Sequence, residues 1–256
     1  MSIIEQLTNA PAGRCIHDQV RARLTGRALY CGINAWNFLI RAEAVKHVPT
    51  VSYFCASHST EEAVAAFLWS ARAHGYKDLA KDISPRDHKH KAVVSEFASM
   101  IADEAGRAGI SFTYHPKKDD LFARVKIEGE FQYRHLNLGL ISYNKDEGDT
   151  DPDAAEGAFM STYPGDIEMV RALERKADFR NQALYAGKEG APSMTPEALE
   201  RQLRYHGVIT LGLLWAASDM SRHDGERVPF VVQSLGAMNR ICQRMSKKRC
   251  SSSNDG

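Results

Sequence analysis

A short basic run, RDHKHK at residues 86–91, holds the side chains best suited to phosphate chemistry. Imidazole titrates near neutral pH and can move a proton, while guanidinium and ammonium groups bind phosphate oxygens. Helical spacing places His90 with the apolar residues that follow, which indicates a structural role, and turns His88 away from them. Arg86, His88 and Lys91 therefore predict a phosphate-binding cluster at a helix N-terminus. A solvated helix start without a ligand is the alternative.

Two adjacent acidic residues, Glu61 and Glu62, stand among apolar residues. A carboxylate that is buried there needs a basic partner, because an unpaired buried charge is costly. Arg86, Lys91 and Arg180 are the candidates for that partner. The resulting network can hold helices together without any catalysis.

Helices must position these groups, because apolar residues recur at helical spacing through the first 107 residues. One helix is expected at residues 26–47. Pro49 can open the next, which either continues to His74 or restarts at Ser59 with capping-box spacing. Ser84 is the expected cap of a third helix, with Pro85 at its first position.

The period changes to two between residues 110 and 143, which predicts a small antiparallel β insert of three strands. Residues 145–157 are acidic and predict a loop. Helices return near Gly165, again at Thr195-Pro196 with a cap followed by proline, and finally near Pro229. We therefore expect one mainly α domain over residues 1–247, a helical bundle with a β insert, and a disordered tail at 248–256.

The composition narrows the class of protein. The chain has 256 residues, with 33 Lys+Arg against 32 Asp+Glu and 43% hydrophobic residues, which excludes a disordered chain and a uniformly basic nucleic-acid binder. No apolar run approaches the roughly 18 residues of a membrane span, and no secretion signal is expected. Five cysteines without a CxxC pair indicate free thiols in a reducing, cytoplasmic setting and no zinc site.

Three segments carry a resemblance to a known family. They are STEEA at residues 59–63, RDHKHK at 86–91, and RNQALY at 180–185 followed by Pro192, Thr195 and Pro196. In these pieces, which span about half of the chain in the expected order, the sequence resembles the AbiV family of abortive-infection (phage-resistance) proteins, part of the HEPN superfamily. The resemblance implies a helical bundle that commonly forms homodimers and, in many members, cleaves RNA without a metal or another cofactor.

The resemblance also implies a signature of one arginine and one histidine separated by four to six residues. Arg201 and His206 have a gap of four residues and are the expected catalytic pair. Five positions rotate by about 140° around a helix, so His206 shares a face with buried residues while Arg201 points nearly opposite. A buried structural histidine beside a solvated arginine is the alternative.

The sequence therefore predicts a prokaryotic antiviral-defence protein, acting as a metal-independent RNase or an RNA-binding toxin. Arg201 and His206 are its catalytic candidates, Arg86, His88 and Lys91 its RNA-binding cluster, and Glu61, Glu62 and Arg180 its supporting network. RNA, a second copy of the chain and a protein regulator are the expected partners, and a membrane is not. The rival interpretation is a non-catalytic helical module that pairs with an effector or regulator.

Overall fold

The computed structural model describes residues 2–143, 149–182, 193–223 and 225–252, with side chains omitted at 179–182 and 247–252. The helices are α1 (Ile3–Asn9), α2 (Pro11–Arg23), α3 (Gly26–Ala44), α4 (Pro49–Ala73), α5 (Lys77–Ala80), α6 (His88–Arg107), α7 (Asp153–Met160), α8 (Asp166–Gln182), α9 (Pro196–Asp219) and α10 (Pro229–Ser252), with short 3-10 turns η1 (Leu138–Leu140) and η2 (Met220–His223). The strands are β1 (Ser111–His115), β2 (Asp120–Ile127) and β3 (Glu130–His135). The predicted mainly α fold with a small β insert is confirmed.

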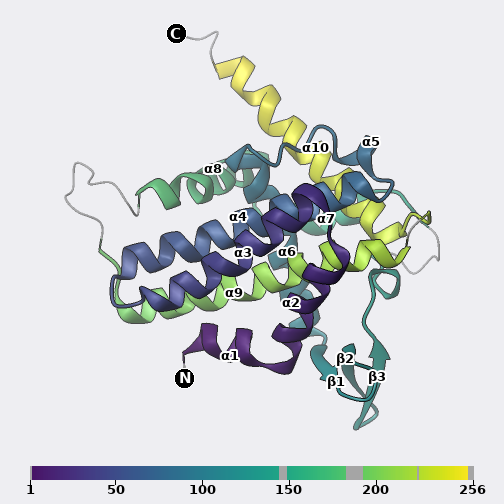
Figure 1. The fold of residues 1–256 in the computed structure, drawn as a ribbon. Coiled ribbons are helices and arrows are strands. Elements are labelled where there is room, and N and C mark those ends of the chain that lie inside the picture. The colour runs from purple at the N-terminus through teal and green to yellow at the C-terminus, as the bar shows by residue number, and fades with distance from the viewer. Residues whose placement is uncertain (1, 144–148, 183–192, 224, 253–256) are drawn as a thin grey trace.

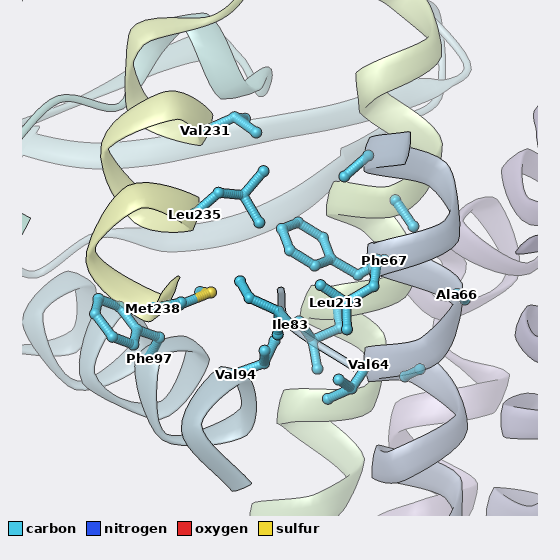
Figure 2. Packing of buried hydrophobic residues seen from close by; sticks show 14 of the residues in the cluster. Val64, Ala66, Phe67, Ile83, Val94, Phe97, Leu213, Val231, Leu235 and Met238 are labelled. Carbon is cyan, nitrogen blue, oxygen red and sulfur yellow. The ribbon is translucent and has the colours of Figure 1, made fainter. Parts of the chain in front are cut away.

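The centre of the molecule is a layer in which α3, α4 and α9 lie side by side, with α1 beneath α9 (Figure 1). α4 is almost entirely buried because α3, α6 and α9 all pack on it. An apolar stripe of α4, which includes Val64, Phe67 and Leu68, faces the main core. Figure 2 shows Val64 and Phe67 packed toward Leu213 of α9 and Leu235 of α10. Burial of this stripe is the main force that joins the helices.

The sequence predicts the N-cap residues of α9 and α6, and the structure agrees for α9 alone. Thr195 caps α9 as expected, since its side-chain oxygen accepts a hydrogen bond from the backbone N–H of Ala198, and Pro196 is the first helical residue. The prediction for Ser84 was wrong. α6 begins at His88, and the Asp87 carboxylate accepts from the N–H groups of Lys89 and His90. A carboxylate caps a helix N-terminus well, so the later residue takes the role.

The β insert is a three-stranded antiparallel sheet in the order β1-β2-β3. A tight turn joins β2 to β3, and both of its residues, Glu128 and Gly129, have positive φ. β3 ends at His135, earlier than the predicted end at Tyr143, because Leu136 and Leu138 leave the sheet and enter the core. With Leu121 they attach the sheet to the helices, as a small sheet requires.

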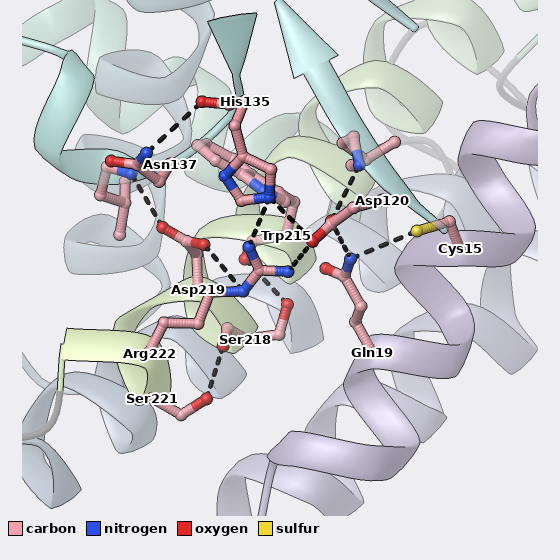
Figure 3. A network of polar contacts seen from close by, with 12 residues as sticks. Cys15, Gln19, Asp120, His135, Asn137, Trp215, Ser218, Asp219, Ser221 and Arg222 are labelled. Atoms are coloured by element: carbon pink, nitrogen blue, oxygen red, sulfur yellow. Dashed lines mark hydrogen bonds and ion pairs between the residues drawn. The ribbon is translucent and has the colours of Figure 1, made fainter. Parts of the chain in front are cut away.

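A polar network also attaches the β insert to η2 and the end of α9 (Figure 3). Asp120 at the start of β2 pairs with His135 of β3 at 3.0 Å and with Arg222 of η2. Burial opposes ionisation of Asp120, but its hydrogen bonds with His135 and Arg222 outweigh burial and lower its pKa to about 2. Asp219, fully buried at the end of α9, accepts a hydrogen bond of 2.8 Å from the N–H of Leu138.

The acidic segment differs from the prediction of a loop over residues 145–157. α7 begins inside it, at Asp153, and Glu156 is 7% exposed. Arg240 and Arg244 of α10 both pair with Glu156, which makes helix formation and burial of that carboxylate possible. Arg240 and Arg244, two basic residues near the C-terminus, are thus held in ion pairs within the fold. α10 also includes part of the expected disordered tail, because it continues to Ser252, and residues 253–256 lie outside the described residues.

None of the described helices combines the length and the apolar character that crossing a membrane requires.

Candidate functional site

Four helices enclose a pocket of about 550 Å³. Its lining comprises Tyr53, Ser57, Thr60, Glu61 and Val64 from α4; His88, Lys91, Ala92 and Ser95 from α6; Arg175, Lys176 and Ala177 from α8; and Arg201, Gln202, Tyr205 and His206 from α9. Within each helix these residues are one, three or four positions apart. In α4 and α6 such spacing places the lining residues on one side of the helix, whereas in α8 and α9 the lining residues spread around the helix from the exposed Arg175 and Arg201 to the buried Ala177 and His206.

The lining is strongly cationic. Lys91, Arg175, Lys176 and Arg201 contribute positive charge, while Glu61 is the single carboxylate in the described lining. Arg175 and Arg201 are exposed, whereas the side chain of Lys91 is only 8% exposed. Within the described ranges no ion-pair partner is found for Arg175 or Arg201. The pocket therefore has a net positive potential and open guanidinium groups at its mouth, a combination that attracts anions.

Glu61 joins two of the basic groups. Its carboxylate lies 3.6 Å from the ammonium of Lys91 and 3.0 Å from Nδ1 of His88. Of the three candidate partners Arg86, Lys91 and Arg180, it is Lys91 that pairs with Glu61, whose side chain is 14% exposed. A carboxylate can only accept hydrogen bonds, so Nδ1 of His88 donates to Glu61. The His88 side chain is 45% exposed, which leaves the ring within reach of solvent and ligands.

A second linked group spans α6, α8 and α9. The ammonium of Lys176 pairs with Glu96, bonds the hydroxyl of Tyr205, and lies 4.3 Å from the centroid of the Tyr205 ring. Tyr205 in turn donates to Glu96 at 3.0 Å. Burial lowers the pKa of Lys176 to about 8. A lysine with this pKa is still mostly protonated at neutral pH but gives up its proton more readily than an exposed lysine.

His206 is buried, as its predicted face required. Leu199, Leu203 and Thr210 on that face are buried too. Nδ1 of His206 shares a hydrogen bond of 2.9 Å with the hydroxyl of Thr60. Burial, and then the positive charge of Lys176, lowers the pKa of His206 to about 3. The imidazole is therefore neutral at pH 7 and cannot deliver the proton of an imidazolium ion.

Hydroxyl groups continue this polar contact between α4 and its neighbours. Thr210 lies 3.2 Å from both Ser59 and Thr60, measured between side-chain oxygens. Ser59 donates to the backbone carbonyl of Ala35 on α3 at 2.7 Å. These buried oxygen atoms satisfy one another, which is what makes their burial tolerable.

Arg201 and His206 both line the pocket despite their different directions on α9. Arg201 is exposed and His206 is buried, so they meet the pocket at different depths. This is the combination that the structural alternative predicts: a satisfied buried histidine beside a solvated arginine. A catalytic role for the pair stays a prediction.

The structure separates the other predicted residues. Glu62 is absent from the pocket lining and accepts a hydrogen bond of 3.1 Å from Asn34 of α3. Arg86 is exposed and also absent from the lining, so the predicted cluster reduces to His88 and Lys91. His90 has a structural contact, as predicted, since it accepts from the N–H of Ser84 at 2.9 Å. The side chain of Arg180 lies outside the described residues.

Several polar lining residues were not predicted from the sequence, among them Arg175, Lys176 and Tyr205. Adjacent basic residues on a charged helix are common and usually solvated. A usable signal was the placement of Lys176 one position before Ala177, which continues the apolar stripe of α8. That position lies at the border of the buried face, where a long cation can reach into the interior.

The described residues contain no group of three or more His, Cys, Asp or Glu side chains arranged to hold a metal ion. Neither a protein-family model, nor a curated protein, nor a solved structure matches this chain.

Proposed function

We propose that this protein binds single-stranded RNA through the cationic pocket and cleaves it without a metal ion, as an AbiV-like, HEPN-related protein of prokaryotic antiviral defence. The observation that carries the proposal is the convergence of Lys91, Arg175, Lys176 and Arg201 with the Glu61–His88 pair in one pocket of about 550 Å³. A homodimer and a protein regulator, expected from the same resemblance, stay predictions.

Phosphate binding follows from the charges. The exposed guanidinium groups of Arg175 and Arg201 can each donate two parallel hydrogen bonds to a phosphate group. The deeper ammonium of Lys91 adds charge where water is scarce and electrostatic attraction is stronger. The near-zero net charge of the whole chain is compatible with this local site, because the acidic residues concentrate elsewhere, for example in α7.

Proton transfer is assigned to His88 and Lys176. Nε2 of His88 takes the proton of a ribose 2′-hydroxyl, and the oxygen bonds to the adjacent phosphorus. The bond from phosphorus to the 5′-oxygen breaks, and that oxygen takes a proton from the ammonium of Lys176. The products are a 2′,3′-cyclic phosphate and a 5′-hydroxyl. Glu61 orients the ring of His88 and stabilises its positive charge, while Arg201 stabilises the charge on phosphorus oxygens.

This assignment gives His206 a positioning role in place of the catalytic role that the signature implies. A neutral imidazole with a pKa of about 3 is a poor base, and its Nδ1 is already bonded to Thr60. His88 is exposed and carboxylate-supported, so it fits the base better.

The test is cleavage of a labelled single-stranded RNA by the purified full chain, with and without EDTA. Wild type is expected to cleave equally in both conditions and to leave cyclic phosphate ends. His88→Ala should slow cleavage about a hundredfold or more, because general base catalysis typically contributes that much. His47→Ala is the matched control, since His47 is exposed and outside the pocket lining.

Cleavage that requires a divalent metal, or that survives His88→Ala unchanged, contradicts the mechanism. Binding of RNA without cleavage would support RNA binding by the pocket and contradict its proposed catalytic activity.

The pairing inside the pocket favours one rival, a non-catalytic interaction module. Glu61 is bonded to both His88 and Lys91, and Lys176 to Glu96, so the polar groups also serve as a network that joins α4, α6, α8 and α9. If this is their main role, Glu61→Gln lowers stability while RNA is neither bound nor cleaved by wild type.

A further inference from the structure

A second cavity, apolar and of about 470 Å³, lies away from the cationic pocket. Its long walls are one stretch of α6, from Val94 to Ala102, and one stretch of α9, from Val208 to Ala216. Residues of α1, α2, α10 and the β insert, together with Phe67 of α4, complete the lining. Figure 2 shows four of the lining residues, Phe67, Val94, Leu213 and Met238, where they pack in the core. The volume is in the range of small-molecule sites.

The lining is almost free of polar groups. Gln6 and Ser234 are the only polar side chains among the described lining residues, and the Ser234 hydroxyl is 3.1 Å from that of Tyr143. No charged side chain belongs to the described lining. Water gains few hydrogen bonds in such a space, so an apolar occupant is favoured over solvent.

The space is open along α9. A methyl group added at Gly212 would meet no atom within 4 Å, although Gly212 lies in a helix and borders the cavity. Gly212 and Val208, one turn apart, are both exposed, as are Gln6 and Phe112. These residues mark the mouth. Because these residues are exposed, the recess is open to solvent on this side, and an open recess with apolar walls is the usual form of a small-molecule site.

The dimensions favour a chain-like ligand. The stretches of α6 and α9 each extend for about 12 Å at 1.5 Å per residue, so the cavity can follow a helix for two turns. A stable protein interface buries about 800 Å² on each side, far more than the recess alone offers, which favours a small ligand over a folded partner.

The mouth adds a charge preference. Arg204 is exposed and stands one helical turn before Val208, on the same face of α9. An anionic head group that emerges at Val208 would lie beside this guanidinium. We propose that the cavity binds a medium-chain fatty acid, with its hydrocarbon chain between α6 and α9 and its carboxylate at Arg204. This site is independent of RNA binding.

The test uses the full chain loaded with the fluorescent apolar probe N-phenylnaphthylamine, which decanoate is expected to displace. Gly212→Leu fills the recess and should weaken decanoate binding at least about tenfold, a change in affinity that titration resolves easily. Gly106→Leu is the matched control, because Gly106 is also helical with no atom within 4 Å of an added methyl group, but lies outside the lining. Circular dichroism and melting curves check that both variants fold.

Arg204→Gln should weaken binding of decanoate and leave binding of decanol unchanged. Equal affinity of wild type for decanoate and decanol overturns the carboxylate assignment. Failure of decanoate to bind wild type, or unchanged binding by Gly212→Leu, overturns the site. Binding to phosphatidylglycerol vesicles without binding of free decanoate, or a dimer that Gly212→Leu dissociates, identifies a different occupant and also overturns it.

Discussion

Nδ1 of His206 on α9 lies 2.9 Å from the hydroxyl oxygen of Thr60 on α4, and both residues are buried. This bond ties together two of the most extensively packed helices of the molecule, at the floor of the cationic pocket. Burial, and then the charge of Lys176, lowers the pKa of His206, which explains why a histidine in the expected signature position is neutral.

Removal of the Thr60 hydroxyl should destabilise the fold. Thr60→Val keeps the shape of the side chain but leaves a buried nitrogen of His206 without its partner, at an expected cost of about 1–3 kcal/mol in the free energy of unfolding. Urea denaturation measures this. Thr50→Val, in the partly exposed first turn of the same helix, is the control and should change stability by less than about 0.5 kcal/mol.

Stability should depend on pH through His206. Its pKa is about 3 in the folded protein and 6.5 when unfolded, so the unfolded state binds the extra proton between these values. Stability from this group is therefore complete above pH 6.5 and is lost as pH falls toward 3, by up to about 1.4 kcal/mol per pH unit. Denaturation of wild type and His206→Gln between pH 7 and pH 5 should show a steeper slope for wild type. Parallel slopes would refute it.

Asp120 should make stability depend on pH in a more acidic range than His206 does. Its folded pKa of about 2 lies below the ordinary 3.8, so its stabilisation is present above pH 4 and is lost as pH falls through 2. Asp120→Asn weakens the pairing with Arg222 and His135 and should expose the β insert to proteolysis at neutral pH. Asp78→Asn is the control, because the Asp78–Arg227 pair is exposed and should matter little.

Glu61→Gln should destabilise the bundle by about 2 kcal/mol or more, since it leaves the ammonium of Lys91 buried without a counter-charge. Glu104→Gln removes a carboxylate from an exposed pair with Arg107 on the same helix as Lys91, and should cost less than about 0.5 kcal/mol. Thermal denaturation of the two variants compares them directly. Equal effects would mean that Lys91 is hydrated and that the pocket network adds no stability.

RNA affinity should fall with salt. About three phosphate contacts, from Arg175, Arg201 and Lys91, predict a slope near −2 for log affinity against log salt concentration with single-stranded RNA. Arg201→Ala should make the slope shallower by about 0.7, whereas Arg107→Ala, an exposed residue outside the pocket, should not. A slope near zero for wild type would place RNA, if bound, elsewhere.

Much of the fold follows from local sequence. Apolar spacing locates α3, α4, α6 and α9, and the Thr195-Pro196 pair marks the first turn of α9. The errors share a cause. Residues 145–157 predict a loop because they are acidic. α7 forms there because the distant Arg240 and Arg244 make burial of Glu156 favourable. β3 stops early because Leu136 and Leu138 gain more by entering the core.

The site shows the same division. Helical spacing alone separates His88 from His90 and places His206 on a buried face. It cannot show that α8 crosses the opening with Arg175 and Lys176, since nothing local ties that helix to α4 or α6. Nor can it tell that Glu61 faces Lys91 while its neighbour Glu62 faces α3, because this depends on which helices pack against α4.

The hydroxyl contacts between α3, α4 and α9 have a mechanical consequence. Sliding or rotating α9 by one residue would break the bonds of Thr210 with Ser59 and Thr60 together with the bond to His206. These hydrogen bonds fix the register of α9 against α4. They lie in the interior, so dissolved salt does not weaken them. They hold the like charges of the pocket in place against their mutual repulsion. The backbone of α9, which carries Arg201, is thus fixed against α4 before an anion arrives, and binding energy is spent only on ordering the exposed arginine side chains.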